Sequence, residues 1–430
     1  MNPVRSSLNR SRDMMDNYGK KRETSNGMKK PIVFVGLSGG VDSAVSAALL
    51  QKATPNNFEK LFGRPTPKGF RGYEVVGVFI KTWHPDFLPC NEEEERRDAM
   101  RVAAFLDIPF LTFDFETVYK KEVADYMIRE YKAGRTPNPD VMCNKKVKFG
   151  VFLKKALALG ADYVATGHYA GVNRGHSFFS ALRPSPDYSG GTLGQLKKGM
   201  PAIHLLKSID PTKDQSYFLW TLKQEQLKKI LFPVGHLKKT EVRKLAKKLN
   251  LPVAKKKDSQ GICFLGAIDL KEFLKHYIKE KKGQVILIPS ESEGETKNNV
   301  IGYHSGAVFS TLGERHGFTI TKKTPDDRPY YVVGKDVKKN ILYVSQGDKN
   351  SENFPAFALG DTGQGTHGSL NFPSFCLTLK DANWISEIPS PDKTYTVQVR
   401  YHGELLPCKL KVYPERSRRA QIIFSKPVLV

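Results

Sequence analysis

The stretch Gly36-Leu37-Ser38-Gly39-Gly40-Val41-Asp42-Ser43 decides the fold, because it lies between a short apolar run and a helical one. The run before it, Pro31 to Val35, is typical of a buried parallel strand, and Ala44 to Leu50 is typical of a helix that begins at Asp42 or Ser43. A glycine-rich loop that ends at a helix N-terminus presents backbone N–H groups to an anion. The stretch therefore predicts a phosphate-binding loop in an α/β domain.

The loop is not of the Walker A type, because no Gly-Lys-Ser/Thr ending follows the glycines. It resembles instead the PP-loop, Ser-Gly-Gly-x-Asp-Ser, of enzymes that adenylate a substrate and release pyrophosphate. Residues 38–43 match that pattern at every fixed position. The alternative is an ordinary glycine-rich turn between a strand and a helix, which the number of matched positions disfavours.

Length and charge narrow the class of protein. With 430 residues the chain is long enough for two to four domains of roughly 100–200 residues each. Its 68 Lys and Arg residues exceed its 44 Asp and Glu residues, and the formal net charge of +24 favours a polyanionic partner such as RNA or DNA. The alternative is a surface of solvated lysines, because pairs such as Lys247-Lys248 are expected on helix faces.

The cysteines indicate the compartment. Cys90, Cys143, Cys263, Cys376 and Cys408 are odd in number and contain no Cys-x-x-Cys pair, so the sequence predicts neither a disulfide framework nor a zinc site. We therefore expect a reducing cytoplasm. No apolar run of the sequence approaches the ~20 residues that span a bilayer, so we expect no membrane insertion.

From about Pro31 to Gly266 the pattern alternates between strand and helix. This alternation predicts an open, mostly parallel sheet that binds ligands at the carboxyl ends of its strands. Two stretches rich in Pro, Gly, Asn and Ser, Thr54 to Gly72 and Arg174 to Gly199, are expected to be surface insertions. The expected strands are Val75 to Phe79, Pro109 to Phe113 and Tyr163 to Thr166, and the expected helices are Glu92 to Leu106, Glu116 to Tyr131 and Val147 to Leu159.

After two more expected helices, Leu237 to Leu249 and Ile268 to Lys281, the pattern changes to short β-type runs separated by Gly and Pro. These runs are Val285 to Ile288, Tyr330 to Val333, Ile341 to Val344, Thr394 to Tyr401 and Gln421 to Phe424. We expect a basic, disordered tail over residues 1–29, with Met28 as an alternative start, and an α/β catalytic domain over 30–266. A central β-rich domain is expected over 267–328 and a C-terminal β-barrel over 329–430.

Two cysteines have neighbours that favour chemistry. Cys143 follows two prolines and a glycine, which predict an irregular loop before the Val147 helix, and Lys145, Lys146 and Arg135 are expected to stabilise its thiolate. Asp140, three residues earlier, is a candidate proton acceptor. Cys263 lies in a second such loop, Asp258 to Phe264. The alternative for each cysteine alone is a small, buried apolar side chain.

Together these segments resemble the tRNA-specific 2-thiouridylase family of PP-loop enzymes, which convert the wobble uridine of certain tRNAs to 2-thiouridine. The resemblance runs from about Pro31 to Val430. In the segment Leu312 to Gly317 the family more often has Gly-Gln-Arg where this chain has Gly-Glu-Arg, so Glu314 is a departure. The segments that carry it are the phosphate loop, residues 138–144, Ala165 to Ala170, Lys213 to Phe218, Asp258 to Phe264, Gly302 to Gly306 and Leu312 to Gly317.

The resemblance implies a Rossmann-like PP-loop domain that binds ATP, a central β-rich domain that binds tRNA, and a C-terminal β-barrel. It implies an enzyme, a tRNA-uridine 2-sulfurtransferase, that adenylates the uracil 2-oxygen and then transfers sulfur from a cysteine persulfide. The products are 2-thiouridine, AMP and pyrophosphate. Relatives usually continue through a further aromatic strand, so we expect a truncated barrel with an unpaired apolar edge.

The resemblance also implies roles for single residues. Cys263 carries the incoming sulfur as a persulfide, and Cys143 is the nucleophile that resolves the product by forming a disulfide with Cys263. Asp42 offers an oxygen ligand for the Mg²⁺ that accompanies ATP. His168 faces the substrate, or alternatively is satisfied within the sheet. ATP is bound by Gly36, Leu37, Ser38, Gly39, Gly40, Val41, Asp42, Ser43, Ile80 and Gly167; the target base by Asn138, Pro139 and Asp140; and tRNA by Lys213, Asp214, Gln215, Arg400 and Tyr401.

The implied partners are tRNA and a protein that donates sulfur through a persulfide relay, and we expect a monomer in the absence of tRNA. Other PP-loop ligases, of the GMP or argininosuccinate synthetase type, need neither two loop cysteines nor the excess of positive charge. A 4-thiouridine or lysidine synthetase would lack the 138–144 segment. A tRNA-binding protein with a decayed active site is disfavoured by the intact loop, Asp140, Cys143 and Cys263.

Overall fold

The chain divides into two compact units. The computed structural model describes residues 30–62, 65–67, 69–88, 91–173, 203–258, 269–288, 299–325, 327–346, 374–413 and 419–428. The first unit comprises Met1–Val123, Asp140–Ala267 and Ile385–Glu387, and the second comprises Ala124–Pro139, Ile268–Trp384 and Ile388–Val430. Within the described ranges, every helix is too short or too polar to cross a bilayer.

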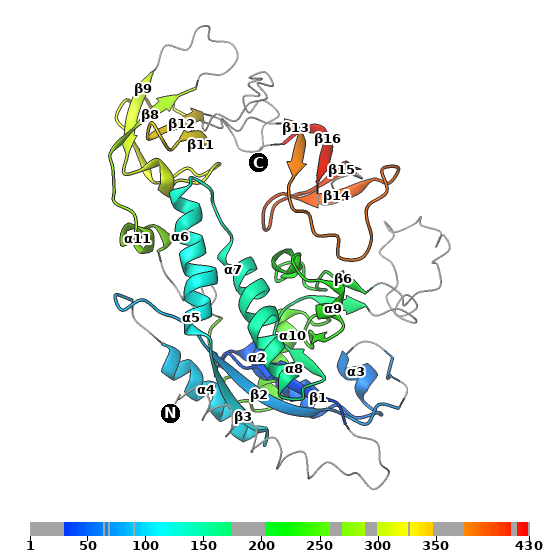
Figure 1. Ribbon diagram of the computed structural model, residues 1–430. Helices are drawn as coiled ribbons and strands as arrows, with labels where there is room; N and C mark the ends of the chain where they lie inside the picture. The colour runs from blue at the N-terminus through cyan, green and yellow to red at the C-terminus, as the bar shows by residue number, and fades with distance from the viewer. Residues whose placement is uncertain are drawn as a thin grey trace. The chain divides into compact units, whose positions relative to one another are not determined.

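The first unit is built on a five-stranded sheet in the order β3-β2-β1-β4-β7, in which all neighbouring strands are parallel (Figure 1). This confirms the predicted α/β class with a parallel sheet. The central strand β1 is buried along most of its length, as its β-branched and aromatic residues predict. The strands are β1 (Ile32–Gly36), β2 (Glu74–Lys81), β3 (Phe110–Asp114), β4 (Tyr163–Ala165) and β7 (Ile230–Leu231), and a two-stranded sheet pairs β5 (Gly171–Asn173) with β6 (His204–Leu206).

Helices α2 (Val41–Gln51) and α10 (Lys239–Lys248) contact each other and share one apolar core with β1 and β2. The first expected insertion belongs to this core as well. It contains the short helix α3 (Phe58–Phe62), whose buried Phe58 and Phe62 pack against each other, and Phe58 also packs against Phe70. The expectation of a mere surface insertion at 54–72 is therefore wrong, because its aromatic side chains supply apolar area to the core. The second insertion, 174–199, lies outside the described residues.

Among the remaining helices of the α/β region, two are of the wider π type. The expected helix over 116–131 is interrupted by a π-helical turn, and the one over 147–159 begins earlier, at Pro139. These elements are α4 (Glu92–Phe105), α5 (Glu116–Tyr119), η1 (Lys120–Ala124), α6 (Asp125–Lys132), α7 (Pro139–Met142), η2 (Cys143–Phe152), α8 (Leu153–Ala158), η4 (Ser216–Leu219) and α9 (Gln224–Leu227).

The second unit contains a five-stranded sheet in the order β10-β9-β8-β12-β11. β12 pairs in parallel with β8, so residues 330–346 belong to the same sheet as residue 283 and the boundary expected at 328/329 falls inside it. α11 is shorter than the expected 268–281 helix and is capped by the Asp269 carboxylate. The elements are α11 (Leu270–Lys275), β8 (Gly283–Leu287), β9 (Val300–His304), η5 (Ala307–Phe309), β10 (Phe318–Ile320), β11 (Tyr330–Asp336) and β12 (Ile341–Gln346).

A four-stranded antiparallel sheet follows in the order β13-β16-β15-β14. Its strands are β13 (Ser374–Leu379), β14 (Tyr395–Gln398), β15 (Leu405–Val412) and β16 (Ala420–Val428). β16 lies between β13 and β15, so the last described strand is hydrogen-bonded on both sides, and β13 and β14 form the edges. The unpaired apolar edge expected from a truncated barrel is therefore not formed by this strand.

Candidate active site

The phosphate loop, residues 36–43, connects β1 to α2 and is held by its own serines. The Ser38 backbone N–H donates to Ser43 Oγ at 3.2 Å, and Ser43 Oγ donates to the Gly40 carbonyl at 3.1 Å. α2 begins at Val41, and among the described residues no side chain caps this helix end at Gly40. The N–H groups of a first helical turn have no carbonyl partner within the helix, so they favour an anion here. The strand, loop and helix N-terminus follow one another as predicted.

Two glycines allow the backbone to close around this helix end. Gly39 has φ +70°, and a Cβ there would overlap the backbone carbonyl of Glu95 at the start of α4. Gly167 follows β4, and a Cβ there would lie 2.8 Å from the Ser43 nitrogen. The structure thus brings Gly167 against the phosphate loop. A cradle of backbone N–H groups without side chains fits a phosphate group.

Ile80 lies near the carboxyl end of β2, the strand that pairs with β1, and its side chain is buried. It therefore belongs to the edge of the sheet from which the phosphate loop emerges. Its contact with the nucleotide stays a prediction.

An ammonium group shared by two carboxylates lies beside the loop. Lys239 Nζ donates to Asp42 Oδ1 at 2.7 Å and to Asp42 Oδ2 at 2.8 Å, and it lies 3.0 Å from Asp258 Oδ1. The Tyr169 hydroxyl donates to Asp42 Oδ1 at 2.7 Å. Burial, followed by the charge of Asp42, raises the pKa of Tyr169, so this hydroxyl keeps its proton. We call the group Asp42–Lys239–Asp258 the lysine bridge.

The lysine bridge changes the expected role of Asp42. Asp42 Oδ1 accepts hydrogen bonds from both Lys239 and the Tyr169 hydroxyl, and Asp42 Oδ2 accepts one from Lys239, so a Mg²⁺ ion at Asp42 would share this carboxylate with an ammonium group. Within the described part of the chain, no group of three or more His, Cys, Asp or Glu side chains is placed to hold a metal ion.

The Asp258 carboxylate is held by cationic side chains from α10 and from the loop before η4. Arg243 donates to the Asp258 carboxylate and to the Lys256 carbonyl, and Lys213 Nζ lies 3.5 Å from Asp258 Oδ2. Burial disfavours the charged form of Asp258, but the hydrogen bonds and charges of Lys239 and Arg243 outweigh it and lower the pKa of Asp258. Asp258 therefore stays ionised at neutral pH.

The segment expected to bind tRNA, residues 213–215, divides into one available cation and two structural side chains. Asp214 accepts hydrogen bonds from the Ser208 backbone N–H at 2.9 Å and from the Ser216 hydroxyl at 2.8 Å. The Gln215 side chain accepts the Tyr169 backbone N–H at 2.9 Å. Lys213, which is 44% exposed at its side chain, can still reach a phosphate.

Cys143 does not lie in the irregular loop that the sequence predicts. It is the first residue of η2, directly after α7, and it is only 1% exposed. Proline is tolerated at the first position of a helix, so Pro139 begins a helix here instead of breaking one. Asp140 lies three residues before Cys143, a spacing that places two side chains on one helix face.

The cations expected to stabilise the Cys143 thiolate are mostly engaged elsewhere. Arg135 pairs with Glu130, with Nη2 at 2.9 Å from Oε1, and Lys146 pairs with Glu122 at 2.8 Å. Lys145 is exposed to solvent. Two of the three cations expected to stabilise the Cys143 thiolate therefore have carboxylate partners of their own.

His168 is buried and satisfied, which was the alternative to a role in facing the substrate. Its Nδ1 is hydrogen-bonded to Thr166 Oγ1 at 2.7 Å and its Nε2 to Asn144 Oδ1 at 3.2 Å. Asn144 in turn donates to the Phe218 carbonyl at 3.2 Å. Burial and the charge of Lys148 hold the pKa of His168 well below its usual value, so the ring is neutral. His168 thus connects the end of β4 to the helix that carries Cys143.

Other predicted site residues belong elsewhere in the chain. Asn138 and Pro139 end the segment 124–139 that groups with the second unit, whereas Asp140 and Cys143 group with the first. In the second unit, Thr136 is hydrogen-bonded to Thr311 at 3.3 Å between their hydroxyls. Cys263 lies outside the described residues, as does Cys90.

Arg400 and Tyr401 lie in a turn after β14 and not in the predicted strand 394–401, because β14 ends at Gln398. The Gly403 N–H donates to the Arg400 carbonyl at 2.8 Å, which closes the turn. Tyr401 is 37% exposed, and its ring centroid lies 4.0 Å from that of His402. An exposed aromatic ring beside an arginine is suited to stacking on an unpaired base.

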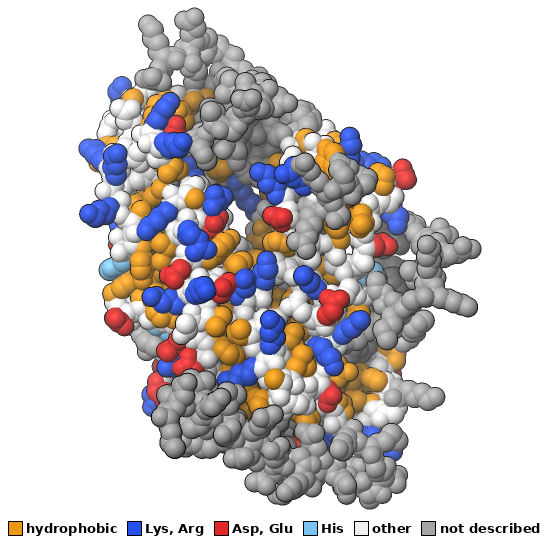
Figure 2. Space-filling view, viewed as in Figure 1, with side chains coloured by type: hydrophobic (Ala, Val, Ile, Leu, Met, Phe, Trp, Pro, Cys, Tyr) orange, Lys and Arg blue, Asp and Glu red, His pale blue; other side chains and the backbone are white. Residues whose placement is uncertain are grey.

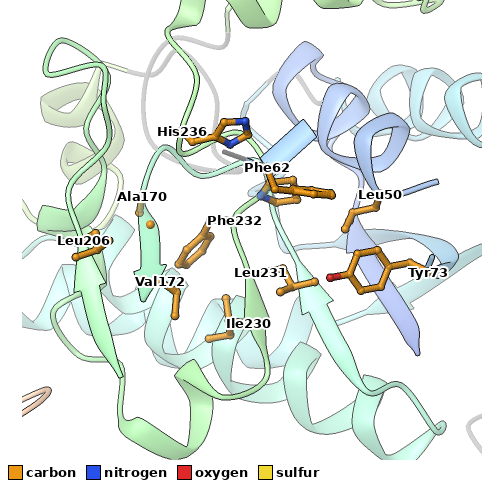
Figure 3. A pocket seen from close by; sticks show the side chains of 12 residues that line it. Leu50, Phe62, Tyr73, Ala170, Val172, Leu206, Ile230, Leu231, Phe232 and His236 are labelled. Carbon is orange, nitrogen blue, oxygen red and sulfur yellow. The ribbon is translucent and has the colours of Figure 1, made fainter. Parts of the chain in front are cut away.

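The surface and the pocket add little to this site. In Figure 2, Lys and Arg side chains are spread over the visible face, with fewer Asp and Glu among them. Figure 3 shows a pocket whose lining is mainly aliphatic and aromatic, including Phe62, Phe232 and Leu231. None of the residues that line it belongs to the phosphate loop or the lysine bridge.

Sequence reasoning missed the lysine bridge. Asp258 and Tyr169 belong to segments that carry the resemblance, but the sequence predicts Lys239 and Arg243 only as part of the helix Leu237 to Leu249. Their spacing on α10, i and i+4, places both cations on one helix face and is the signal that could have found them.

Comparison with known proteins identifies the family. The tRNA-specific 2-thiouridylase MnmA of Streptococcus thermophilus is 44% identical over 321 residues, which cover 74% of this chain and 73% of that protein. MnmA of Geobacillus thermodenitrificans is 37% identical over 397 residues, covering 92% and 87%. The chain belongs to the tRNA-specific 2-thiouridylase family.

Family models match the chain along most of its length. They are described as a tRNA methyl transferase HUP domain over residues 69–267, a tRNA methyl transferase PRC-barrel domain over 271–346, and an aminomethyltransferase beta-barrel domain over 374–429. A solved U34-tRNA thiolase, NcsA from Methanococcus maripaludis, is 14% identical with a TM-score of 0.31 and covers 63% of this chain and 74% of its own.

The burial of neutral His168 predicts an acid-sensitive stability. The unfolded state binds a proton near the ordinary histidine pKa of 6.5, whereas folded His168 does so only at lower pH. Stability should therefore fall as pH decreases below about 6.5, with a slope that approaches ~1.4 kcal/mol per pH unit from this group. His168→Gln should make the dependence of melting temperature on pH shallower between pH 7 and 5. His204→Gln, at an exposed site of the same unit, is the control, and parallel curves for wild type and His168→Gln would contradict the assignment.

Proposed function

We propose that the chain catalyses the ATP-dependent 2-thiolation of the wobble uridine of tRNA. The relatives named tRNA-specific 2-thiouridylase support formation of 2-thiouridine in tRNA. The mechanism that we propose is adenylation of the uracil 2-oxygen, followed by sulfur transfer from a cysteine persulfide. The observation that carries this proposal is the glycine-lined phosphate loop in the same unit as the Asp140–Cys143 helix.

The phosphate loop is suited to hold a triphosphate. ATP supplies an adenylyl group that turns the uracil 2-oxygen into a leaving group, and pyrophosphate is released. Backbone N–H groups at the start of α2, with the Ser38 and Ser43 hydroxyls, stabilise the phosphate charge. Lys239 adds a positive charge beside the loop. Mg²⁺ is part of this proposal, and Asp42 would hold it beside the Lys239 ammonium.

The sulfur transfer needs two cysteines. The terminal sulfur of the Cys263 persulfide attacks C2 of the adenylated base, and AMP leaves with the 2-oxygen. The Cys143 thiolate then attacks the Cys263 sulfur, which breaks the S–S bond to the base and leaves 2-thiouridine and a Cys143–Cys263 disulfide. Asp140 accepts the Cys143 proton. An external thiol must reduce the disulfide, and a persulfide-carrying protein must reload Cys263, before the next turnover.

The buried position of Cys143 gives this step a physical advantage. A thiol that is 1% exposed is protected from solvent oxidants until the target base is in place. Asn138, Pro139 and Asp140 are proposed to contact that base. Lys213, Arg400 and Tyr401 are proposed to contact tRNA, with Asp214 and Gln215 holding the Lys213 loop. We place the reaction in the cytoplasm and propose a monomer in the absence of tRNA.

The adenylation step predicts the products of ATP cleavage. The purified chain incubated with ATP, Mg²⁺ and unmodified tRNA should form AMP and pyrophosphate, because the loop lacks the Walker lysine and keeps the PP-loop pattern. Thin-layer chromatography of radiolabelled nucleotide distinguishes these products. Formation of ADP and phosphate would contradict the proposal, and ATP without tRNA serves as the control.

The two-cysteine mechanism predicts which thiols are essential. Cys143→Ser and Cys263→Ser should each abolish 2-thiouridine, measured by mass spectrometry of tRNA nucleosides, while pyrophosphate release persists. Cys408→Ser is the matched control for Cys143→Ser, because Cys408 is also buried, and Cys376→Ser tests an exposed thiol. Both controls should keep near-normal yield. A near-normal yield from either Cys143→Ser or Cys263→Ser would refute the mechanism.

The structure separates three lysines that the sequence treats alike. Lys255 and Lys257 are exposed, whereas Lys256 Nζ pairs with Asp98 at 2.7 Å. Lys255→Ala with Lys257→Ala should weaken tRNA binding and lower the salt slope by roughly 0.7–0.9 per lost phosphate contact, as filter binding would measure. Lys256→Ala should instead lower the free energy of unfolding by about 0.5–1 kcal/mol, because the partly buried Asp98 loses one of its two described cationic partners and keeps Arg101. Equal losses of tRNA affinity in all variants, with unchanged stability, would contradict this division.

A further inference from the structure

The turn that follows β4 contacts two parts of the active site at once. Gly167 lies against the phosphate loop, because a Cβ there would be 2.8 Å from the Ser43 nitrogen. The residues on either side of it, Thr166 and His168, begin a hydrogen-bonded chain that ends on η2, the helix whose first residue is Cys143. One short turn therefore has contacts both with the phosphate loop and with the helix that carries the proposed nucleophile.

Each hydrogen bond of this chain has one direction. The Asn144 Nδ2 group donates to the Phe218 carbonyl at 3.2 Å, so Asn144 Oδ1 faces His168 as an acceptor. His168 Nε2 must then carry the single proton of the neutral ring. Its Nδ1 is left to accept the proton of the Thr166 hydroxyl, at 2.7 Å. The orientation of each side chain thus depends on its neighbour in the chain.

The chain is enclosed by apolar side chains. Thr166, His168 and Asn144 are 6%, 7% and 3% exposed. The His168 ring packs against the rings of Phe149 and Phe232, with centroids 5.7 and 5.9 Å away. A polar group that loses its partner in such surroundings has no water to replace it. Removal of one hydrogen bond is therefore expected to weaken the whole chain.

The helix at the other end of the chain is unusual. η2 is ten residues of π-helix, a form that is rare and that occurs frequently at functional sites. Asn144 in its first turn bonds to His168 and to η4, and the Phe149 carbonyl accepts the Gln226 side chain of α9 at 2.6 Å. Cys143 immediately precedes Asn144, so the contact with His168 acts on the turn that carries the thiol.

We propose that Asn144, His168 and Thr166 are positioning residues that fix the thiol at the start of η2 relative to the phosphate loop. Sulfur transfer requires this thiol to reach a base that has been activated at the loop, so the separation of the two elements must be held. The chain holds it because the turn after β4 contacts both elements. The proposal rests on the proposed function in taking Cys143 as the nucleophile.

Thr166→Val tests the chain with little change in shape, because it replaces the hydroxyl that donates to His168 by a methyl group. Thr166→Ser keeps the hydroxyl and is the matched control. The readout is the rate at which iodoacetamide alkylates Cys143 in the full-length chain, followed by peptide mass spectrometry. Cys408, which is also buried and belongs to the second unit, is the internal reference.

A buried thiol reacts only when its surroundings open, so its rate reports the local stability of η2. Thr166→Val should raise the Cys143 rate about tenfold and leave the Cys408 rate within about twofold of wild type. Thr166→Ser should react like wild type. Equal Cys143 rates in the two variants would overturn the proposal. A parallel rise at Cys143 and Cys408 would also overturn it, because the whole chain would then be less stable.

Asn144→Leu removes the other end of the chain and should also raise the Cys143 rate about tenfold. Because Asn144 and Thr166 act through the same His168 ring, their effects should not add. The double variant Thr166→Val with Asn144→Leu should react within about threefold of Asn144→Leu alone. A rate near the product of the two single effects would show that the two side chains act separately, and it would overturn the chain as a unit.

Turnover separates positioning from substrate binding. In Thr166→Val the kcat for 2-thiouridine should fall about tenfold, while KM for tRNA and the ATP affinity measured by calorimetry stay within about twofold. Thr166→Ser should keep the wild-type kcat. A raised KM with unchanged kcat would overturn the positioning role. If wild type forms no 2-thiouridine, the proposed function fails, and the alkylation rates, which need neither ATP nor tRNA, alone decide whether this chain fixes the start of η2.

Discussion

The absence of side chains where β1, β4 and α4 meet the start of α2 is the constraint on which the active site depends. Gly39 passes against the Glu95 carbonyl, and Gly167 passes against the nitrogen of Ser43, at distances that no Cβ would allow. Backbone that approaches so closely brings the N–H groups of a helix N-terminus together with two serine hydroxyls. The rest of the site is arranged around that end. β4 leads through His168 to the Cys143 helix, and α10 places Lys239 over Asp42.

Charge is the second organising principle of the site. The chain carries a large positive excess, yet the surroundings of the phosphate loop are nearly neutral, because acidic and basic side chains are paired there. Such pairing prevents a strong local field around the loop.

The parts of the structure that sequence could predict are those with local signals. The phosphate loop was predicted correctly because strand, glycines and helix follow one another within twenty residues, and the parallel sheet followed from the alternation of strand and helix. The Cys143 segment was misjudged because proline breaks a helix interior but is tolerated at a first turn, and the sequence does not distinguish the two. The lysine bridge joins residues 197 positions apart, and a pairing of that range leaves no periodic pattern. The domain boundary expected at 328/329 falls inside a sheet for the same reason, since β12 pairs with β8 across a long connection.

The second unit includes residues 124–139, which lie in the sequence between two parts of the first unit. This arrangement has consequences for folding during synthesis and for the design of fragments. Tyr131 of α6 is buried, and burial together with the charge of Glu314 raises its pKa to about 12, so its surroundings are supplied by chain that emerges from the ribosome much later. Until then α6 must remain without its packing partners, a non-local arrangement that slows folding. No single cut between residues 123 and 268 separates the two units cleanly. A catalytic fragment that ends near residue 267 would keep α6 and expose its apolar face, so a soluble minimal enzyme would require redesign of that helix and not merely truncation.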